Sequence, residues 1–252
     1  MTAVLSLVDA TVVHGTRIAL RGLSATIGAG ESLGLVGRSG SGKSTAAGCL
    51  AGLLRPTSGE VVFEGRDVRR LTGAQRRVFH RAVQLVPQDC PAALDRWTTV
   101  AEALTEPALV HGLIAKRDRD RHVRGLLDLV RLPAAVADRY PDELSGGQAQ
   151  RVVLGRALGL RPRVLIADES VSALDVSTRA QVVNLMTDLR DDLGLALVFV
   201  DHDLPLVCHV ADRLLVLHGG GEIARGTREE LRASPHPAVG ELFRASELPP
   251  LS

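Results

Sequence analysis

The sequence is poor in aromatic residues and cysteines, and each shortage narrows the class of protein. Only 2% of the 252 residues are aromatic, whereas 45% are hydrophobic. A core must therefore be built from aliphatic side chains packed on sheets and helices. The three cysteines, Cys49, Cys90 and Cys208, are widely spaced and fit neither a zinc pattern nor a disulfide framework. These features favour a reduced, cytosolic protein of the α/β class.

Long hydrophobic runs and an excess of one charge are also missing. No apolar run approaches the ~20 residues of a membrane-spanning helix, and residues 1–10 lack the basic start of a signal peptide. The formal net charge is +1, so we expect no nucleic acid among the partners. If the protein works at a membrane, we expect partner subunits to hold it there.

Short runs of β-branched and aliphatic residues alternate with longer stretches of helical periodicity. This alternation predicts a mostly parallel sheet covered by helices. The first third differs, because short alternating segments around 4–8, 25–27 and 60–63 predict a small antiparallel β subdomain. The strands expected in the main sheet are residues 32–36, 82–86, 164–167, 196–200 and 213–217.

From about residue 91 to residue 139 the pattern becomes helical, with apolar residues recurring three and four positions apart. We interpret this stretch as a helical insertion into the core. The chain is then a single domain, 1–252, with three parts. These are a β subdomain with the core (1–90 and 160–220), a helical subdomain (about 91–158) and a C-terminal tail (221–252).

Residues 37–44, GRSGSGKS, fit the phosphate-loop pattern G-x-x-x-x-G-K-[ST]. They follow the expected strand 32–36 and precede a helix-like run, 45–53, as the motif requires. Glycines let backbone N–H groups surround phosphates at a helix start whose dipole favours anions. Lys43 would hold the β- and γ-phosphates, and Ser44 would ligate Mg²⁺. The predicted phosphate-binding residues are Gly37, Arg38, Ser39, Gly40, Ser41, Gly42, Lys43, Ser44 and Thr45.

An apolar strand further along the chain ends in two acids, Asp168 and Glu169. At the carboxyl end of a sheet, Asp168 can reach Mg²⁺ through water. Glu169 is a candidate general base for the attacking water, which separates a hydrolase from a passive nucleotide binder. Alone, the acids could be a solvated turn and the loop an accidental match. Their occurrence together favours the functional interpretation of both.

Residues 144–148 have the sequence LSGGQ, and the residues that follow show helical periodicity as far as Leu158. Glycines at a helix start imply a second anion site, and five specified residues match by chance far less often than the phosphate loop does. With the loop upstream and the acids downstream, the chain resembles the nucleotide-binding subunits of ABC transporters over nearly its whole length. The resemblance implies a P-loop NTPase fold. This fold has a RecA-like core, in which a mostly parallel sheet is flanked by helices. An antiparallel β subdomain lies at the N-terminal end of the sequence, and a helical subdomain is inserted in the core.

The resemblance also implies a head-to-tail dimer that binds ATP and Mg²⁺. In the family, the LSGGQ segment of one subunit caps the γ-phosphate held by the loop of the other. Residues 172–175, SALD, look like the D-loop along that interface and include Asp175. The LSGGQ residues assigned to this role are Ser145, Gly146, Gly147 and Gln148.

Two further residues acquire roles only from the resemblance. Gln88 looks like the Q-loop glutamine that senses the γ-phosphate and Mg²⁺, and His202 looks like the switch histidine that contacts the γ-phosphate. Without the family, they would be a surface amide and one of eight histidines. Their order and their placement at strand ends favour catalytic roles for both.

Two positions depart from the family pattern. Ser170-Val171 stands where Pro-Thr is usual, outside the reactive groups. The aromatic residue that stacks on adenine falls near His14, and no Tyr, Phe or Trp occurs before Phe63. The His14 imidazole could stack on the base, or His14 could be a loop residue without a role, and both interpretations remain open.

Several segments are similar to the oligopeptide, dipeptide and nickel importer branch, namely 83–89, 176–177 with 180–185, 202–204 and the SPHP tail element 234–237. The Tyr-Thr that usually follows is Ala238-Val239 here, and the sequence stops at Ser252 without the longer tail of many peptide importers. This difference tilts the expectation toward the nickel or metallophore type.

The resemblance therefore implies an ATPase subunit of an importer of peptides, nickel or a metal chelate. It would lie peripherally on the cytoplasmic face of the inner membrane. Its partners would be two permeases, an identical or homologous second ATPase subunit and, indirectly, an extracytoplasmic substrate-binding protein.

Two alternatives remain. The first is a soluble ABC-fold ATPase acting on DNA or ribosomes. Such proteins usually carry a coiled-coil insertion, a second cassette or a basic patch, and the sequence shows none of these. The second is a regulatory nucleotide binder with weak hydrolysis, and the intact Lys43, Asp168, Glu169 and His202 argue against it.

Overall fold

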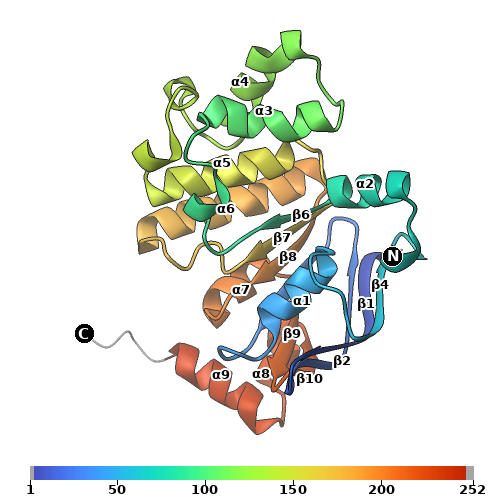
Figure 1. Cartoon of the computed structure of the whole chain (residues 1–252). Coiled ribbons are helices and arrows are strands. Elements are labelled where there is room, and N and C mark those ends of the chain that lie inside the picture. Colours follow the sequence, from blue (N-terminus) through green and yellow to red (C-terminus); the bar gives the residue numbers. More distant parts are fainter. Residues whose placement is uncertain (1–2, 248–252) are drawn as a thin grey trace.

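The computed structural model describes residues 3–247, and two β-sheets form its centre (Figure 1). The smaller sheet is antiparallel, with strand order β2-β1-β4-β5. Its first two strands are longer than the sequence predicted, because β-bulges between Leu7 and Ala10 interrupt the alternation of apolar residues. The strands are β1 (Ala3–His14), β2 (Arg17–Gly28), β4 (Ser58–Phe63) and β5 (Arg66–Asp67).

The larger sheet has six strands in the order β10-β9-β3-β8-β7-β6. All its neighbouring pairs are parallel except β9 with β10, which form an antiparallel hairpin. The hairpin joins the first residues of the expected C-terminal tail to the core sheet. The strands are β3 (Ser32–Val36), β6 (Val83–Val86), β7 (Val164–Asp168), β8 (Ala196–Val200), β9 (Arg213–His218) and β10 (Gly221–Gly226).

Strands β3, β7 and β8 of the larger sheet are buried on both faces, and successive residues enter different cores. In β7, Val164 and Ile166 belong to the core that the antiparallel sheet covers. The alternate residues Leu165 and Ala167 belong to the core on the helical side. This double burial explains why the parallel strands are continuous apolar runs.

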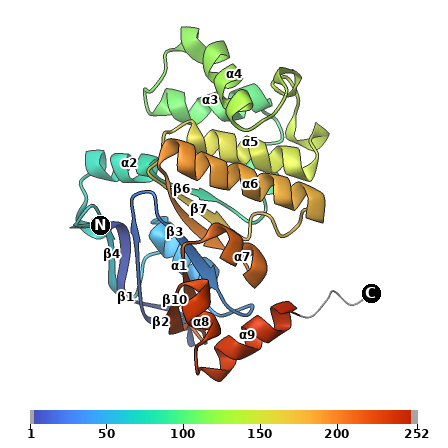
Figure 2. The ribbon, with the colours of Figure 1, turned by 180° about the vertical axis from the view of Figure 1, so that it is seen from behind.

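The helices lie on both sides of the larger sheet. In Figures 1 and 2, α5 and α6 lie side by side along one face, and α3 and α4 stack on the outside of α5. The helices are α1 (Lys43–Leu50), α2 (Gly73–Ala82), α3 (Val100–Val110), α4 (Arg119–Leu129), α5 (Gly146–Leu158), α6 (Val176–Leu193), α7 (Leu204–Val210), α8 (Arg228–Arg232) and α9 (Pro237–Glu247). Short 3₁₀ turns are at Val68–Arg70, Pro91–Ala93, Lys116–Asp118, Ala134–Val136 and Pro141–Glu143.

The structure has the expected α/β architecture, with α3, α4 and α5 inserted between β6 and β7. Helix α1 is shorter than the run 45–53 suggested. Gly52 adopts φ +71°, and the N–H groups of Leu53 and Leu54 turn back to the Gly48 carbonyl. This glycine termination ends the helix although apolar residues continue. Within residues 3–247, no helix is both long and apolar enough to span a membrane.

Candidate nucleotide-binding site

The parallel strands deliver the predicted site residues to one edge of the larger sheet. Strands β3, β6, β7 and β8 run in the same direction, so their carboxyl ends lie at the same edge. The segments that follow them carry the phosphate loop, Gln88, Glu169 and His202. Ligands of open α/β sheets collect at such an edge. The sheet order, rather than proximity in sequence, therefore assembles the candidate site.

The loop between β3 and α1 is wound so tightly that only glycine fits at its two ends. Gly37 has φ +152° and Gly42 has φ +104°. A Cβ on Gly37 would lie 2.3 Å from the Leu217 carbonyl oxygen, and one on Gly42 would lie 2.5 Å from that of Ala19. Side chains larger than hydrogen would unwind the loop.

The loop also offers polar groups suited to an anion. Lys43 is only 4% exposed, and its ammonium group donates to the Gly37 carbonyl at 2.9 Å. The buried Ser41 hydroxyl has no hydrogen-bond partner among the described residues. Buried polar groups are normally paired, so this cradle fits a phosphate that would supply acceptors.

Glu169 lies over this loop in an unusual backbone conformation. Its φ of +46° is in the left-handed region, and its N–H donates to the Val200 carbonyl at 2.8 Å. Its carboxylate lies 3.6 Å from the Lys43 ammonium and accepts from the Gln88 amide at 3.4 Å. Non-glycine residues with positive φ gather at functional sites, where the surroundings enforce the strain. The predicted base is thus fixed between a cation and an amide donor.

Asp168 and Ser44 form the part of the site suited to a metal ion. The Ser44 hydroxyl donates to Asp168 Oδ1 at 3.0 Å. Burial raises the pKa of Asp168. The hydrogen bond from Ser44 lowers this pKa, the negative charge of Glu169 raises it, and the positive charge of Lys43 lowers it. Hydroxyl, carboxylate and amide oxygens are ligands that Mg²⁺ accepts, so Ser44, Asp168 and Gln88 fit this ion.

Ser44, Gln88 and Glu169 line a cavity of about 450 Å³. Two of its lining residues, Arg17 and Ala19 of β2, were not predicted. His14 pairs with Arg17 across the β1–β2 turn. A hairpin register predicted from the sequence would therefore place Arg17 beside the candidate His14. The lining consists of His14, Arg17, Ala19, Ser39, Gly40, Gly42, Lys43, Ser44, Thr45, Gln88 and Glu169.

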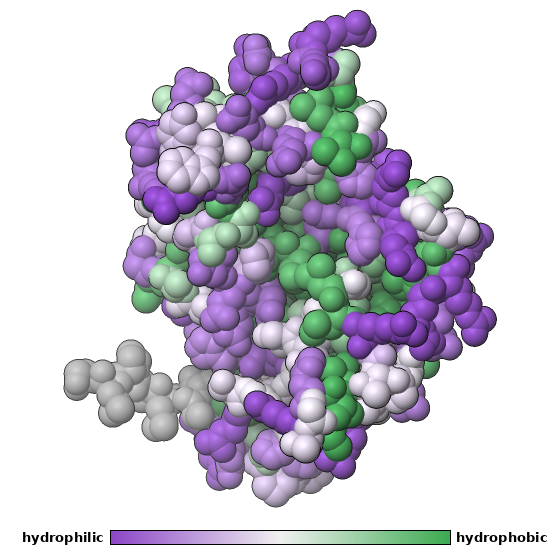
Figure 3. Space-filling model, in the orientation of Figure 1, coloured by the Kyte–Doolittle hydropathy of each residue, from purple (hydrophilic) through white to green (hydrophobic). Residues whose placement is uncertain are grey.

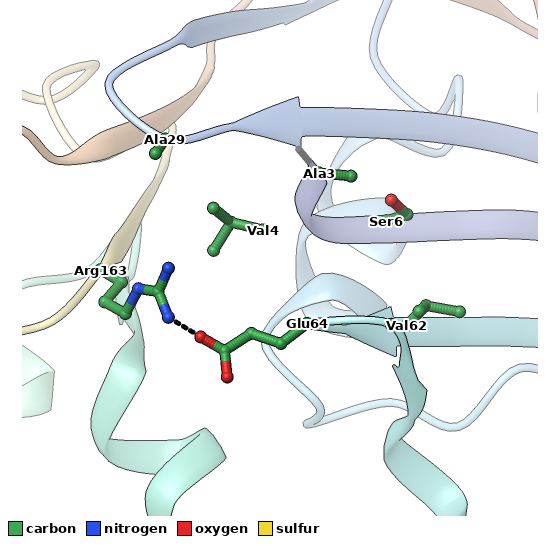
Figure 4. A pocket seen from close by; sticks show the side chains of 8 residues that line it. Ala3, Val4, Ser6, Ala29, Val62, Glu64 and Arg163 are labelled. Atoms are coloured by element: carbon green, nitrogen blue, oxygen red, sulfur yellow. Dashed lines mark ion pairs between the residues drawn. The ribbon is translucent and has the colours of Figure 1, made fainter. Parts of the chain in front are cut away.

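A larger cavity, about 670 Å³, lies beside β1 and the start of β7 (Figure 4). Its lining is mostly small and apolar. Its two charged residues, Glu64 and Arg163, point toward each other and form an ion pair. Among the residues that the structure describes, it therefore offers no free cation to a phosphate, and its size alone does not make it the nucleotide site.

His202 follows β8 at the same sheet edge but does not line the 450 Å³ cavity. Its side chain is 59% exposed, and its Nδ1 lies 3.3 Å from Asp201 Oδ1. The structure therefore places His202 at the predicted edge of the sheet but outside the lining of the cavity.

The LSGGQ segment lies at the start of α5. The Ser145 hydroxyl accepts from the Gln148 N–H at 3.3 Å, and the Gln148 side chain accepts from the Ser145 N–H at 3.1 Å. Such a capping box stabilises the first helical turn. Ser145 and Gly146 are exposed. None of the described residues 144–148 lines the cavity of their own chain.

Asp175 also lies outside the cavity and caps another helix. It is exposed, and its side chain accepts from the Thr178 N–H at 2.9 Å at the start of α6. Like Ser145 and Gly146, Asp175 of the predicted D-loop thus lies at the surface rather than at the phosphate loop of its own chain.

A glycine-wound loop with a buried lysine, facing two acids at the carboxyl edge of a parallel sheet, defines a P-loop nucleotide-binding protein. Comparison with known proteins narrows this class. The family model described as ABC transporter matches residues 20–172. A Brucella abortus (strain 2308) protein named as a peptide import ATP-binding protein is 46% identical over 229 residues, covering 89% of this chain and 69% of the relative.

Two further comparisons agree. The glutathione import ATP-binding protein GsiA of Escherichia coli is 42% identical over 217 residues, covering 86% of this chain and 35% of GsiA. The dimeric post-hydrolysis structure of the ATP-binding cassette MJ0796 bound to ADP and Pi matches with a TM-score of 0.78 and 27% identity. The match covers 88% of this chain and 98% of that one.

The chain belongs to the ABC transporter family. It is an ATP-binding subunit that hydrolyses ATP, and its fold is that of the solved ABC cassettes.

Proposed function

We propose that this subunit powers the import of peptides through partner permeases. The names of similar proteins support this cargo class, because they describe peptide import and import of glutathione, itself a small peptide. The sequence expectation of nickel or a metal chelate gains no support from these names. The single observation that carries the ATPase assignment is the convergence of Lys43, Ser44, Asp168 and Glu169 at one sheet edge.

In this proposal the phosphate loop and Lys43 hold the phosphates of ATP. Ser44, Asp168 and Gln88 hold Mg²⁺, which when bound offsets negative charge on the phosphates. In the structure, Glu169 is the anion beside Lys43. A γ-phosphate would take this place, because it offers the ammonium group more charge and more acceptors. Glu169 is then free to accept a proton from the attacking water.

We further propose that the working unit is a dimer with two ATP molecules at its interface. Lys43 lies inside its cavity, whereas Ser145 and Gly146 are exposed at a helix start outside it. A second subunit can therefore bring its LSGGQ segment, with the partial positive charge of a helix N-terminus, to the γ-phosphate. A dimeric ABC cassette of similar fold supports this arrangement.

Exposed apolar side chains support a further protein partner. Leu53 after α1, Val78 on α2 and Trp97 before α3 are 65%, 51% and 78% exposed. Figure 3 shows hydrophobic residues in a band near the middle of the face that carries α1, bordered by hydrophilic ones. Exposed apolar groups at the surface often mark protein contacts. We propose two permeases as these partners, a peripheral place at the cytoplasmic membrane face, and an extracytoplasmic substrate-binding protein that acts through the permeases.

The Glu169→Gln variant tests this function. The amide keeps the shape of the side chain but cannot accept a proton, so we expect ATP affinity to be retained and turnover to fall at least about 100-fold. Closed, ATP-bound dimers should accumulate on size-exclusion chromatography. Asp89→Asn, an exposed acid outside the cavity, is the matched control. Undiminished ATPase turnover of Glu169→Gln would refute the assignment. Co-purification with DNA or ribosomes instead of permeases would favour the soluble alternative.

A further inference from the structure

Asp201 is a buried acid with no role in the site described above. It directly follows β8 and directly precedes His202, and it is 1% exposed. Its Oδ1 accepts from the Asp203 N–H at 2.9 Å and lies 3.3 Å from Nδ1 of His202. Its Oδ2 is buried without a hydrogen-bond partner in the described part of the chain. A charged group has thus been placed where solvation is poor.

The local turn does not by itself require a carboxylate. A serine or threonine hydroxyl can accept the same backbone hydrogen bond without burying a charge. Burial raises the pKa of Asp201, and the Asp203 backbone N–H, the His202 side chain and the His202 N–H act in the opposite direction. Burying a carboxylate is costly unless a donor or a cation compensates it. A specific partner for the charge is therefore expected.

The other charged groups nearby are engaged elsewhere. Asp203 caps α7 by accepting from the Leu206 N–H at 3.2 Å, and it lies 3.7 Å from the Arg179 guanidinium. Arg179 also donates to the carbonyls of Ser172 and Leu174, at 3.0 and 3.1 Å. The imidazole of His202 is thus the group in contact with the Asp201 carboxylate that can carry a positive charge.

We propose that Asp201 is a positioning residue for His202. Its buried carboxylate holds the hydrogen-bearing Nδ1 of the imidazole, so that Nε2 on the opposite side of the ring faces the terminal phosphate of ATP. This inference rests on the proposed function, because it uses the predicted contact of His202 with the γ-phosphate.

The physical reasons are orientation and charge. The hydrogen bond made by one ring nitrogen sets the orientation of the ring and the state of the other nitrogen. When the ring is protonated, both nitrogens donate, and the carboxylate offsets the positive charge. His202 is exposed, so without this contact its side chain would have to be ordered anew each time ATP binds.

A spectrum of the histidine ring tests the contact without nucleotide. The probe is long-range ¹H–¹⁵N NMR of the full chain with ¹⁵N-labelled histidine, in which His202→Gln identifies the His202 signals. We expect the wild-type ring to carry hydrogen on Nδ1. Asp201→Ser keeps an acceptor for the turn but is too short to hold the ring, so it should shift the population toward Nε2–H. Asp201→Asn, which keeps the side-chain shape, should give a smaller shift in the same direction.

Asp203→Asn is the matched control, because it removes an adjacent acid that pairs with Arg179 instead. It should leave the His202 signals in place. Unchanged His202 signals in both Asp201 variants, or an equal shift in Asp203→Asn, would overturn the proposal.

Steady-state ATPase kinetics test the consequence. We expect Asp201→Ser to lower kcat about tenfold while KM for ATP stays within about twofold, because the contact matters after ATP has bound. His202→Gln should cause a similar loss, and the double variant no further loss, since both changes remove one interaction. Additive losses would show that Asp201 acts separately from His202 and would overturn the proposal.

If His202→Gln alone leaves kcat unchanged, the role of His202 in the proposed function fails, and the inference about catalysis falls with it. A ring spectrum that still depends on Asp201 would then place the failure in the proposed function rather than in the contact.

Discussion

At the scale of single residues, Arg17 is the functional candidate that the motifs did not reveal. Its guanidinium lies beside the phosphate loop, since a Cβ on Gly40 would come within 3.2 Å of Nη2. It also lines the nucleotide cavity with His14. A guanidinium can stack on an adenine base or pair with phosphates. The two residues thus offer a substitute for the missing aromatic side chain.

We predict that Arg17→Ala weakens ATP binding about three- to tenfold, as expected for loss of one exposed cationic contact. Isothermal titration calorimetry with ATP and with adenosine separates the two modes. A phosphate contact lowers the affinity for ATP alone, whereas stacking lowers both affinities. Arg21→Ala, on the same strand but outside the cavity lining, is the control. Equal affinities for wild type and Arg17→Ala would remove Arg17 from the site.

A second prediction at this scale concerns the reactivity of the two buried cysteines, Cys49 and Cys90. Burial raises the pKa of Cys49 to about 11 and that of Cys90 to about 12. Because the thiolate is the reactive form, both thiols should resist iodoacetamide at about pH 8 in the native protein and react after denaturation. Mass spectrometry of labelled peptides measures this. Rapid native labelling of Cys90 would contradict its burial.

The raised pKa values of Cys49 and Cys90 also make the stability of the fold depend on pH. A thiol whose pKa is raised in the folded state stays protonated there, while in the unfolded chain the thiol loses its proton near its ordinary pKa of 9.0. The stabilising contribution is therefore complete below about pH 9 and is lost as the pH rises toward the folded values.

At the scale of elements, the two glycines of LSGGQ serve different purposes. Gly146 is exposed, and a Cβ there would meet Leu174 at an ordinary 3.4 Å. Gly147 is buried against α6, and a Cβ there would lie 2.3 Å from Thr178 Cγ2. Gly147 therefore sets how closely α5 approaches α6, whereas Gly146 leaves the helix start open to a ligand.

We predict that Gly147→Ala destabilises the fold by about 1 to 3 kcal/mol through overpacking, while Gly146→Ala does not. Thermal denaturation of the ligand-free chain checks this, with a loss of about 2 to 4 °C in Tm for each kcal/mol. Adding Thr178→Ser removes the clashing methyl group and should restore much of the loss. If the double variant is no more stable than Gly147→Ala, the clash is not the cause.

Elements that alternate or repeat regularly were predictable from the sequence. The parallel strands are short, apolar on both faces and bounded by turns, so β3, β7 and β8 match the expected runs closely. The antiparallel strands were underestimated because bulges in β1 break the period of two. The end of α1 was missed because Gly52 stops the helix within an apolar run.

The candidate site was predictable to the extent that motifs specify it. The loop glycines and the two acids at the end of β7 follow from local patterns, and the structure places Glu169 of this pair beside Lys43 of the loop. The pairing of Glu169 with Lys43 joins residues 126 positions apart, and no local pattern encodes its 3.6 Å distance. Arg17 depends on the register of a hairpin, and Asp201 on burial by distant elements. Such features come from tertiary packing, which sequence periodicity does not contain.

At the scale of the whole molecule, the proposed function implies that each chain carries two incomplete halves of an ATP site. The cavity is lined by residues of the phosphate loop and by Glu169 but by no residue of the described LSGGQ segment. The exposed start of α5 carries LSGGQ without a phosphate loop. If these halves meet only between chains, then a defect in one half can be complemented by a partner chain with the opposite defect.

We predict such complementation between Lys43→Ala and Gly146→Glu, each combined with Glu169→Gln to trap closed dimers. The first variant lacks the loop cation. The second places a carboxylate where the γ-phosphate must approach, while Glu in the first helical turn is compatible with the dipole of α5. Neither variant alone should form ATP-dependent dimers on size-exclusion chromatography. Their mixture should, because the intact loop of one chain meets the intact LSGGQ of the other at one of the two sites.

The mixture also distinguishes the possible arrangements. Glu169→Gln alone is the positive control and should dimerise with ATP at the same protein concentration. If LSGGQ instead served the ATP held by its own chain, every site in the mixture would contain one defect, and no dimer would form. A mixture that stays monomeric while the control dimerises would therefore refute the intermolecular site. A dimer in the mixture alone requires that Lys43 and Gly146 of one chain act on different ATP molecules.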